Sequence, residues 1–198
     1  ISDPKPSDIH KATVRDRLVH HAISRVLYPF FSRTFIADSF SCQLGKGTHR
    51  AMQRFQAFAN KVSQNHTHTC WVLKGDIRKF FASIDQKILL HLLAERIPDA
   101  SIVTLLQDII GSFSWSHGTG LPLGNLTSQL FVNMYMTPFD QFVKHQLKVK
   151  CYIRYADDFV VLSDNQKWLE SLIPKLEDFL QINLHLDLHP RKVSIQTL

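Results

Sequence analysis

Apolar residues recur at helical spacing in two stretches of the first third of the chain. In residues 14–31 and 45–62 they fall three and four positions apart, which is typical of an amphipathic helix with one buried face. Thr48 is the predicted N-cap of the second helix, because its hydroxyl could accept from free N–H groups of the first turn. The outward face of this helix is predicted to be basic, and it comprises Lys46, His49, Arg50, Arg54 and Lys61.

Strand patterns alternate with helix patterns in the remainder of the chain. Residues 70–77 and two short runs, 151–155 and 159–163, are rich in β-branched and aromatic side chains, which predicts three strands. Four further stretches have the apolar periodicity of helices. They are residues 87–97, 99–111, 125–148 and 165–181.

Several residues mark where these helices begin and end. Ser83 and Gln86 have the spacing of a capping box before the helix that starts near residue 87. Asp99 is the predicted N-cap of the next helix, and Gly111 its predicted C′ residue. The last helix is predicted to tolerate Pro174 because its apolar stripe continues on both sides of this residue.

The final segment, residues 182–195, predicts a half-buried strand because its leucines alternate with polar residues. The complete order from residue 70 is then strand, helices, strand, strand, helix, strand. This order predicts an α+β fold with a βαββαβ antiparallel sheet and extra helices. The alternating leucines are Leu184, Leu186 and Leu188.

This sheet is predicted to bring three aspartates together. Asp76 ends the first strand, while Asp157 and Asp158 lie in the turn between the two central strands. Neighbouring carboxylates repel one another unless a positive charge lies beside them. Mg²⁺ binds one or two carboxylates and completes its shell with water and phosphate oxygens. Two such ions about 3.5–4 Å apart can activate an attacking 3′-hydroxyl and stabilise leaving pyrophosphate.

A purely structural interpretation competes with this one. Aspartate is common in turns, and Asp76 could simply end a strand. Asp85 is better explained as a helix cap than as a metal ligand. The flanking strands and the third aspartate together favour the metal site over the structural interpretation.

Composition adds a nucleic-acid partner to this picture. The 198-residue chain has 44% hydrophobic residues, a net charge of +6 and a pI of about 9.3, which suit one packed domain with a polyanionic partner. It has no apolar run long enough for a membrane span and no signal peptide, so a cytoplasmic protein without a membrane partner is expected. The polar start without Met suggests an excised piece. The cysteines have no metal-ligand spacing and are predicted to be reduced thiols: Cys42, Cys70 and Cys151.

Five segments resemble reverse transcriptase motifs, in order and over essentially the whole chain. The turn and its strands, YIRYADDFVVLS, resemble the YxDD hairpin, and the first strand resembles the first catalytic motif in LKGDIRKFFASID. The other three segments are VRDRLVHHAI, GLPLGNLTSQLFVNMYM and LHLDLHPRKVSI. Ser128-Gln129 in GLPLGNLTSQLFVNMYM is similar to the pair found in bacterial diversity-generating retroelement enzymes, with group II intron-like enzymes as relatives.

The resemblance implies a role for each residue at a matching position. Asp76, Asp157 and Asp158 would be the catalytic metal-binding residues. Asp76 and Asp157 are expected to bridge two Mg²⁺ or Mn²⁺ ions, Asp158 to contribute less direct ligation, and the Ile77 carbonyl to be a further ligand. Phe81 would pack under the incoming sugar and exclude a ribose 2′-hydroxyl, although an ordinary core phenylalanine is the alternative.

Further nucleotide contacts follow from the same resemblance. Leu123 stands where many relatives have a glutamine, so a hydrogen bond to the nucleotide would be lost and fidelity reduced. Gln129 would lie at the nucleotide site, and Lys192, expected just after the last strand, would contact the leaving pyrophosphate. A surface lysine is the alternative for this last residue. The triphosphate-gripping arginine of the family is replaced by Ser7 or Asp8, and two substitutes are proposed for it: Lys5 and Arg15.

The template and primer are expected to follow basic and aromatic side chains. The candidates are Arg50, Arg54, Arg78, Lys79 and Tyr155. Four histidines lack acidic or cysteine partners and are not expected to form a zinc site. They are His20, His21, His66 and His68.

The resemblance also divides the chain into expected domains. Residues 1–69 would be a partial fingers segment, and residues 70–198 the palm, with a helical and loop insert at 99–127. No segment resembles the thumb that grips primer and template, so weak activity of this piece is expected.

The implied activity is RNA-directed DNA polymerisation. Its partners would be an RNA template, a DNA or RNA primer, deoxynucleoside triphosphates and an accessory protein. An RNA-binding or maturase-like module with an unused polymerase site is the alternative: the missing fingers arginine favours it, and the three aspartates oppose it. A diguanylate cyclase is disfavoured because the chain lacks a Gly-Gly-(Asp/Glu)-Glu-Phe-like turn.

Overall fold

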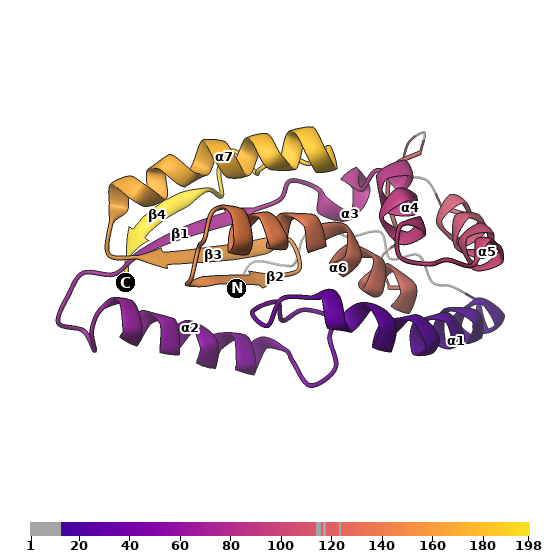
Figure 1. Ribbon diagram of the computed structural model, residues 1–198, viewed down its shortest axis with the longest axis horizontal. Helices are drawn as coiled ribbons and strands as arrows, with labels where there is room; N and C mark the ends of the chain where they lie inside the picture. Colours follow the sequence, from indigo (N-terminus) through magenta and orange to yellow (C-terminus); the bar gives the residue numbers. More distant parts are fainter. Residues whose placement is uncertain (1–12, 114–115, 117, 123) are drawn as a thin grey trace.

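A four-stranded antiparallel sheet forms the centre of the computed structural model, which describes residues 13–113, 116, 118–122 and 124–198 (Figure 1). The strand order is β2-β3-β1-β4, so the first and third strands in sequence lie side by side. The α+β fold and the antiparallel sheet are therefore confirmed. The strands are β1 Trp71–Asp76, β2 Tyr152–Tyr155, β3 Asp158–Ser163 and β4 Ser194–Thr197.

Helices lie on both faces of the sheet, and further helices lie beyond one end of it (Figure 1). Those before the hairpin are α1 Val14–Phe31, the 3₁₀ turn η1 Ser32–Thr34, α2 Thr48–Val62, α3 Phe80–Ser83, α4 Gln86–Ala94 and α5 Ala100–Gly111. The others are α6 Leu126–Gln141, the π-helical η2 Phe142–Gln146 and α7 Gln166–Leu184.

Side chains alternate between two cores on opposite faces of the sheet. On one face, Leu73 and Val161 belong to the large core that includes the buried residues of α6 and α7. On the other face, Val72 and Leu162 join a smaller core with Phe58 of α2. The period of two in β1 and β3 thus places α2 on one face and the pair α6 and α7 on the other.

Helix α1 packs against α6, and helix α2 begins at a glycine. The predicted N-cap Thr48 is wrong by one residue, because it is the first residue of α2 and Gly47 is the cap. Gly47 has a φ of 143°, a conformation open to glycine and costly for a residue with a Cβ atom. The helix consequently starts one residue earlier than the hydroxyl pattern indicated.

Two other predicted helix ends also differ from the structure. The Ser83–Gln86 capping box is wrong: Asp85 is the N-cap of α4, and its carboxylate accepts from the N–H groups of the next turn. Gln86 instead points inward, where its amide donates to the carbonyls of Ile110 and Gly120 at 3.1 and 3.0 Å. Gly111 is the last residue of α5 and not the C′ residue. Asp85 as a cap, Asp99 as a cap and a continuous helix through Pro174 are confirmed.

The strand predicted over residues 182–195 is wrong in position. Leu184 is the last residue of α7, and β4 is the short segment Ser194–Thr197. Leu186 and Leu188 are buried in the connection between them, where Leu188 makes a single antiparallel bridge with Ile77. Their alternation therefore reflects burial of an irregular segment and not a regular strand.

In the portion of the chain described by the structure, no helix combines the length and the apolar character that a bilayer span requires.

Candidate active site

Asp76 and Asp158 face each other at the end of the sheet. They are direct register partners of the antiparallel pair β1 and β3, so their side chains leave the same face. The Ile77 N–H donates to the carbonyl of Asp157 at 3.3 Å, which continues the pairing into the turn. The strand order thus brings together the three aspartates that the sequence predicts to be neighbours.

The turn that carries these aspartates has an unusual backbone. Ala156 has a φ of 54°, in the left-handed region that residues with a Cβ atom rarely adopt. This conformation allows a tight connection between β2 and β3, and Asp157 and Asp158 follow it directly. The neighbouring structure must hold such a residue in place, since left-handed geometry is unfavourable for alanine.

Lys192 supplies a positive charge to the acidic cluster. Its Nζ donates to Oδ2 of Asp76 at 2.6 Å, and this ion pair raises the pKa of Lys192. Lys192 lies in the turn before β4 and not after the last strand, so its predicted place in the chain is corrected. The backbone N–H of Lys192 donates to the His189 carbonyl and so closes the turn before β4.

The other two carboxylates of the cluster, Asp157 and Asp158, both have raised pKa values. Burial raises the pKa of Asp158 to about 6, and the negative charges of Asp157 and Asp76 add to the effect. Burial also raises the pKa of Asp157, to which Asp76 contributes again. An acidic cluster with raised pKa values is typical of a site that binds a cation or handles protons.

The donor set fits a hard divalent cation only in part. Among the described residues, no three His, Cys, Asp or Glu side chains are gathered so that they alone could hold one ion. Asp76 and Asp158 still offer paired carboxylate oxygens, and the positively charged ammonium group of Lys192 already binds to Asp76. Mg²⁺ requires no more than one or two carboxylates when water and phosphate complete its shell. The side chains therefore fit an ion that is shared with a phosphate ligand.

Gly75 creates the close packing beneath this cluster. A Cβ atom built on Gly75 would lie 2.2 Å from Cζ of Phe159, its register partner on β3. Only glycine permits the Phe159 ring to lie across β1 at this point. Gly75 precedes Asp76 and Phe159 follows Asp158, so their contact helps to fix the separation of β1 and β3 at the two aspartates.

The predicted nucleotide contacts lie in several elements. Phe81 is half-buried in α3, its ring is edge-on to Phe80, and its carbonyl accepts from Leu121 N–H. Gln129 lies in the first turns of α6, and Arg15 is exposed in the first turn of α1. Two further candidates, Lys5 and Leu123, lie outside the described residues.

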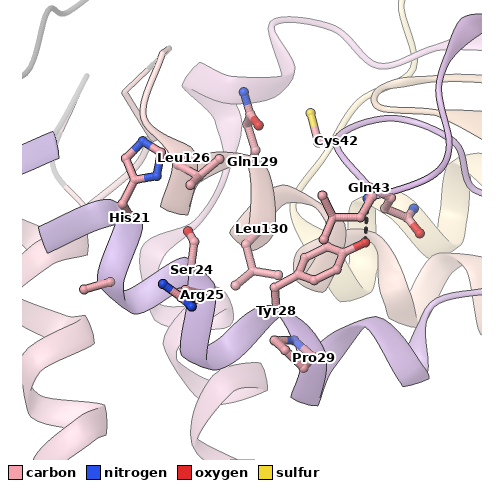
Figure 2. Close-up of a pocket in the computed structure, with 12 residues that line it drawn as sticks. His21, Ser24, Arg25, Tyr28, Pro29, Cys42, Gln43, Leu126, Gln129 and Leu130 are labelled. Atoms are coloured by element: carbon pink, nitrogen blue, oxygen red, sulfur yellow. Dashed lines mark hydrogen bonds between the residues drawn. The ribbon is translucent and has the colours of Figure 1, made fainter. Parts of the chain in front are cut away.

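A hollow of about 730 Å³ lies between α1, the segment around Cys42 and the start of α6 (Figure 2). Figure 2 shows the Tyr28 side chain reaching toward the segment that carries Cys42 and Gln43, where its hydroxyl accepts from Leu44 N–H at 2.7 Å. Gln129 lines the other side. The Oγ atom of Ser24 also faces this region, and it is buried without a hydrogen-bond partner in the part of the chain that is described. The hollow therefore has a mostly apolar lining that also includes the polar side chains of Ser24 and Gln129.

The predicted template contacts are not equivalent. Arg54 is already paired with Asp38, by Nε at 2.7 Å, and its guanidinium stacks on Phe58. Tyr155 is exposed, and its hydroxyl is 3.2 Å from Oγ1 of Thr48, which joins the β2–β3 hairpin to α2. The other three are exposed: Arg50 in α2, and Arg78 and Lys79 just after β1.

Two functional features escaped the sequence patterns. The buried pair Arg154–Asp140 lies directly behind the turn, with 0% and 1% of the side chains exposed. The direct contact between Lys192 and Asp76 was also missed. A charged residue in the inward register of a strand was the available signal for Arg154, but its partner on α6 could not be read from spacing.

Comparison with known proteins agrees with this geometry. The protein family described as "Reverse transcriptase (RNA-dependent DNA polymerase)" matches residues 4–197 of the chain. The chain belongs to the reverse transcriptase family. Its predicted membership is confirmed because the match spans nearly all of the sequence.

Individual relatives are distant from this reverse transcriptase chain. It is 23% identical to Protein YkfC of Escherichia coli, over 92% of this chain and 57% of YkfC. It is also 23% identical to the group II intron-encoded protein LtrA of Lactococcus lactis, over 94% of this chain and 31% of LtrA. The chain thus spans little more than half of the first relative and a smaller part of the second.

Solved telomerases share the fold. Apo telomerase from Candida tropicalis superposes with a TM-score of 0.66 at 11% identity, covering 92% of this chain and 36% of that one. Telomerase from Candida albicans, solved with a fragment of telomeric RNA, gives 0.63 at 11% identity, covering 91% and 33%. At this identity the likeness supports the fold alone.

Proposed function

We propose that the chain is the catalytic part of an RNA-directed DNA polymerase. The observation that carries the proposal is the pairing of Asp76 with Asp158 at the sheet edge, beside Asp157 and in contact with Lys192. Membership of the reverse transcriptase family supports the same reaction class. The proposed substrates are deoxynucleoside triphosphates and a primer annealed to an RNA template.

Asp76, Asp157 and Asp158 are the proposed holders of divalent cations, Mg²⁺ or Mn²⁺, with the Ile77 carbonyl as an additional ligand. When bound, such ions activate the primer 3′-hydroxyl and neutralise charge on the phosphates. The protein orients the carboxylates through the antiparallel register and the tight turn at Ala156. Lys192, half-exposed beside Asp76, is placed to transfer its contact to a phosphate oxygen of the leaving group.

The proposed domain division is the one that the family resemblance implies. Residues 1–69 would correspond to part of the fingers and 70–198 to the palm, with α5 in the insert at 99–127. The hollow beside Gln129 and Ser24 would receive a nucleotide of the template strand, since it combines an apolar wall, the Tyr28 ring and the Ser24 hydroxyl, which is unpaired among the described residues. Arg50, Arg78 and Lys79 would contact phosphates through their exposed side chains.

Primer extension tests the proposal directly. The natural full-length protein is incubated with oligo(dT) on poly(rA), dTTP and either Mg²⁺ or Mn²⁺. We expect extension products with the wild type and none with Asp157→Asn, while the exposed control Asp164→Asn extends normally. A filter-binding assay in the same samples separates the alternative. RNA binding without extension by any of the proteins would favour an RNA-binding or maturase-like module and contradict the polymerase.

A further inference from the structure

Arg154 has the largest fully buried side chain in the part of the chain that the structure describes. It lies in β2, two residues before Ala156, and points toward α6. There Nε donates to Oδ1 of Asp140 at 2.8 Å, and Nη2 donates to Oδ2 at 2.8 Å. This forked geometry is the strong form of an arginine–carboxylate pair, and it offsets much of the cost of burying both charges.

The same guanidinium also holds the catalytic turn. Its Nη1 donates to the carbonyl of Ala156 at 2.9 Å. That carbonyl belongs to the peptide group that carries the N–H of Asp157, and a peptide group is planar. Fixing the Ala156 carbonyl therefore fixes the orientation of the backbone from which the Asp157 side chain leaves.

A left-handed alanine makes this contact important. Ala156 has a φ of 54°, and such a conformation costs on the order of 1–3 kcal/mol unless neighbouring groups enforce it. The Arg154 guanidinium is anchored at Asp140 and reaches the turn from within the core. It can thus hold the turn in a geometry that the turn sequence does not itself favour.

The network continues beyond the turn. Arg154 Nη2 donates to Oδ1 of Asn133 at 3.3 Å, and Asn133 Nδ2 donates to the carbonyls of Gln129 and Ser41, both at 3.1 Å. The Arg154 main chain is also fixed, because its N–H donates to the Asp38 carbonyl at 3.0 Å. One buried residue therefore connects the turn, the helix that carries Gln129 and the segment beside the hollow.

We propose that Arg154 is a positioning residue for Asp157, acting through the Ala156 carbonyl while Asp140 anchors its guanidinium. This inference rests on the proposed polymerase function. Stability alone does not account for the arrangement, since a buried ion pair can often be replaced by apolar residues without loss of stability. An apolar replacement would, however, remove the hydrogen bond to Ala156.

The test separates positioning from folding. The triple variant Arg154→Met/Asp140→Leu/Tyr152→Phe replaces the ion pair, together with the Tyr152 hydroxyl that donates to Asp140, by apolar groups. Arg154→Lys keeps a positive charge for Asp140 but lacks the planar fork needed to hold both Asp140 and Ala156. Thermal unfolding and primer–template binding are measured first, followed by kcat and KM for dTTP.

We expect both variants to fold and to bind primer–template as the wild type does. Their kcat should fall by at least about tenfold with KM nearly unchanged, because a misplaced carboxylate affects the reaction more than substrate binding. Hydrogen exchange should rise in the peptide that covers residues 155–159. If the triple variant does not fold, Arg154→Lys alone decides. A folded variant with wild-type kcat and unchanged exchange in that peptide would overturn the proposal.

A second readout does not depend on polymerase activity. Mn²⁺ affinity is measured by titration calorimetry without primer or nucleotide. Weaker binding by the folded variants than by the wild type supports the positioning role even if the wild-type protein extends no primer, a result that would count against the proposed function alone. Unchanged Mn²⁺ affinity in the folded variants would overturn the positioning role.

Discussion

Lys192 and Asp76, 116 positions apart in the sequence, are joined by a hydrogen bond of 2.6 Å from Nζ to Oδ2. The Asp76 side chain is largely buried, whereas half of the Lys192 side chain is exposed. An exposed lysine can leave such a contact at small cost, since its charge is well solvated. Lys192 is therefore a counter-ion that a divalent cation can displace from the acidic cluster, which would free its ammonium group to contact a phosphate.

Replacing Lys192 should strengthen metal binding while slowing the reaction. In Lys192→Met the lysine no longer competes for Asp76, so Mn²⁺ should bind about threefold to tenfold more tightly, a modest effect because the lysine is solvated. Single-turnover nucleotide addition should be slower, since a cation near the leaving group is lost. Titration calorimetry and rapid-quench kinetics measure the two effects. Arg191→Met is the control, and equal or weaker Mn²⁺ affinity in Lys192→Met would contradict the counter-ion role.

Asp158 makes the stability of the metal-free protein depend on pH. Its folded-state pKa of about 6 lies above the ordinary value of 3.8, so folding favours the protonated form. The stabilising contribution is present below the ordinary value and is lost as pH rises through about 6. Asp158→Asn should therefore raise the melting temperature by a few degrees at about pH 8 and lose this advantage near pH 4.

Melting curves in the presence of a chelator measure this effect. Asp164→Asn serves as the control, because Asp164 is exposed beyond the other end of β3. A gain for Asp158→Asn that was the same at both pH values would show that charge is not its cause. Divalent metal should then stabilise the wild type more than Asp158→Asn, since the variant lacks one carboxylate.

Gly75 should tolerate no side chain. Gly75→Ala would place a methyl group 2.2 Å from the Phe159 ring, so the ring or the strand must move. Overpacking of this kind typically costs about 1–3 kcal/mol, and it should also slow nucleotide addition because both residues adjoin the acidic pair. Gly111→Ala is the matched control: among the described residues, no atom outside its own helix backbone and its chain neighbours lies within 4 Å of the added Cβ, and alanine is favoured in a helix by up to about 1 kcal/mol. Denaturant unfolding measures both variants, and a Gly75→Ala protein as stable as the wild type would refute the packing argument.

Phe81 should select against ribonucleotides. Phe81→Ala removes the ring expected to clash with a 2′-hydroxyl, so the preference for dNTP over rNTP should fall by at least about tenfold. The ratio of kcat/KM for dTTP and UTP measures it, with Phe81→Tyr as a control that keeps the ring. Unchanged discrimination in Phe81→Ala would assign Phe81 to the core that it shares with Phe80.

The sequence was most informative where one regular pattern decided the structure. The order of strands and helices predicted the sheet and the meeting of Asp76 with the hairpin that carries Asp157 and Asp158, because antiparallel topology determines which strand ends meet. The apolar stripe of α7 continues on both sides of Pro174, and it predicted an uninterrupted helix. Element order was sufficient for the sheet, and local periodicity was sufficient for this helix.

Elsewhere, local patterns competed with tertiary contacts. Leu186 and Leu188 alternate like strand residues, but they are buried in an irregular connection that the Ile77 bridge and α7 hold in place. Gln86 has the spacing of a capping residue, but its amide is used inside the protein, and Asp85 caps the helix. Partners that lie far apart in sequence, such as Arg154 and Lys192 with their aspartates, could not be identified from spacing.

The most direct test of the catalytic centre is the single-turnover addition of one deoxynucleotide to a primer on an RNA template. The natural full-length protein is compared with Asp76→Asn, and primer–template binding is measured in the same samples. We predict that Asp76→Asn binds the primer–template as the wild type does but adds the nucleotide at least about a hundredfold more slowly, because ligand geometry at the cations is lost. Addition at the wild-type rate by Asp76→Asn would contradict the account.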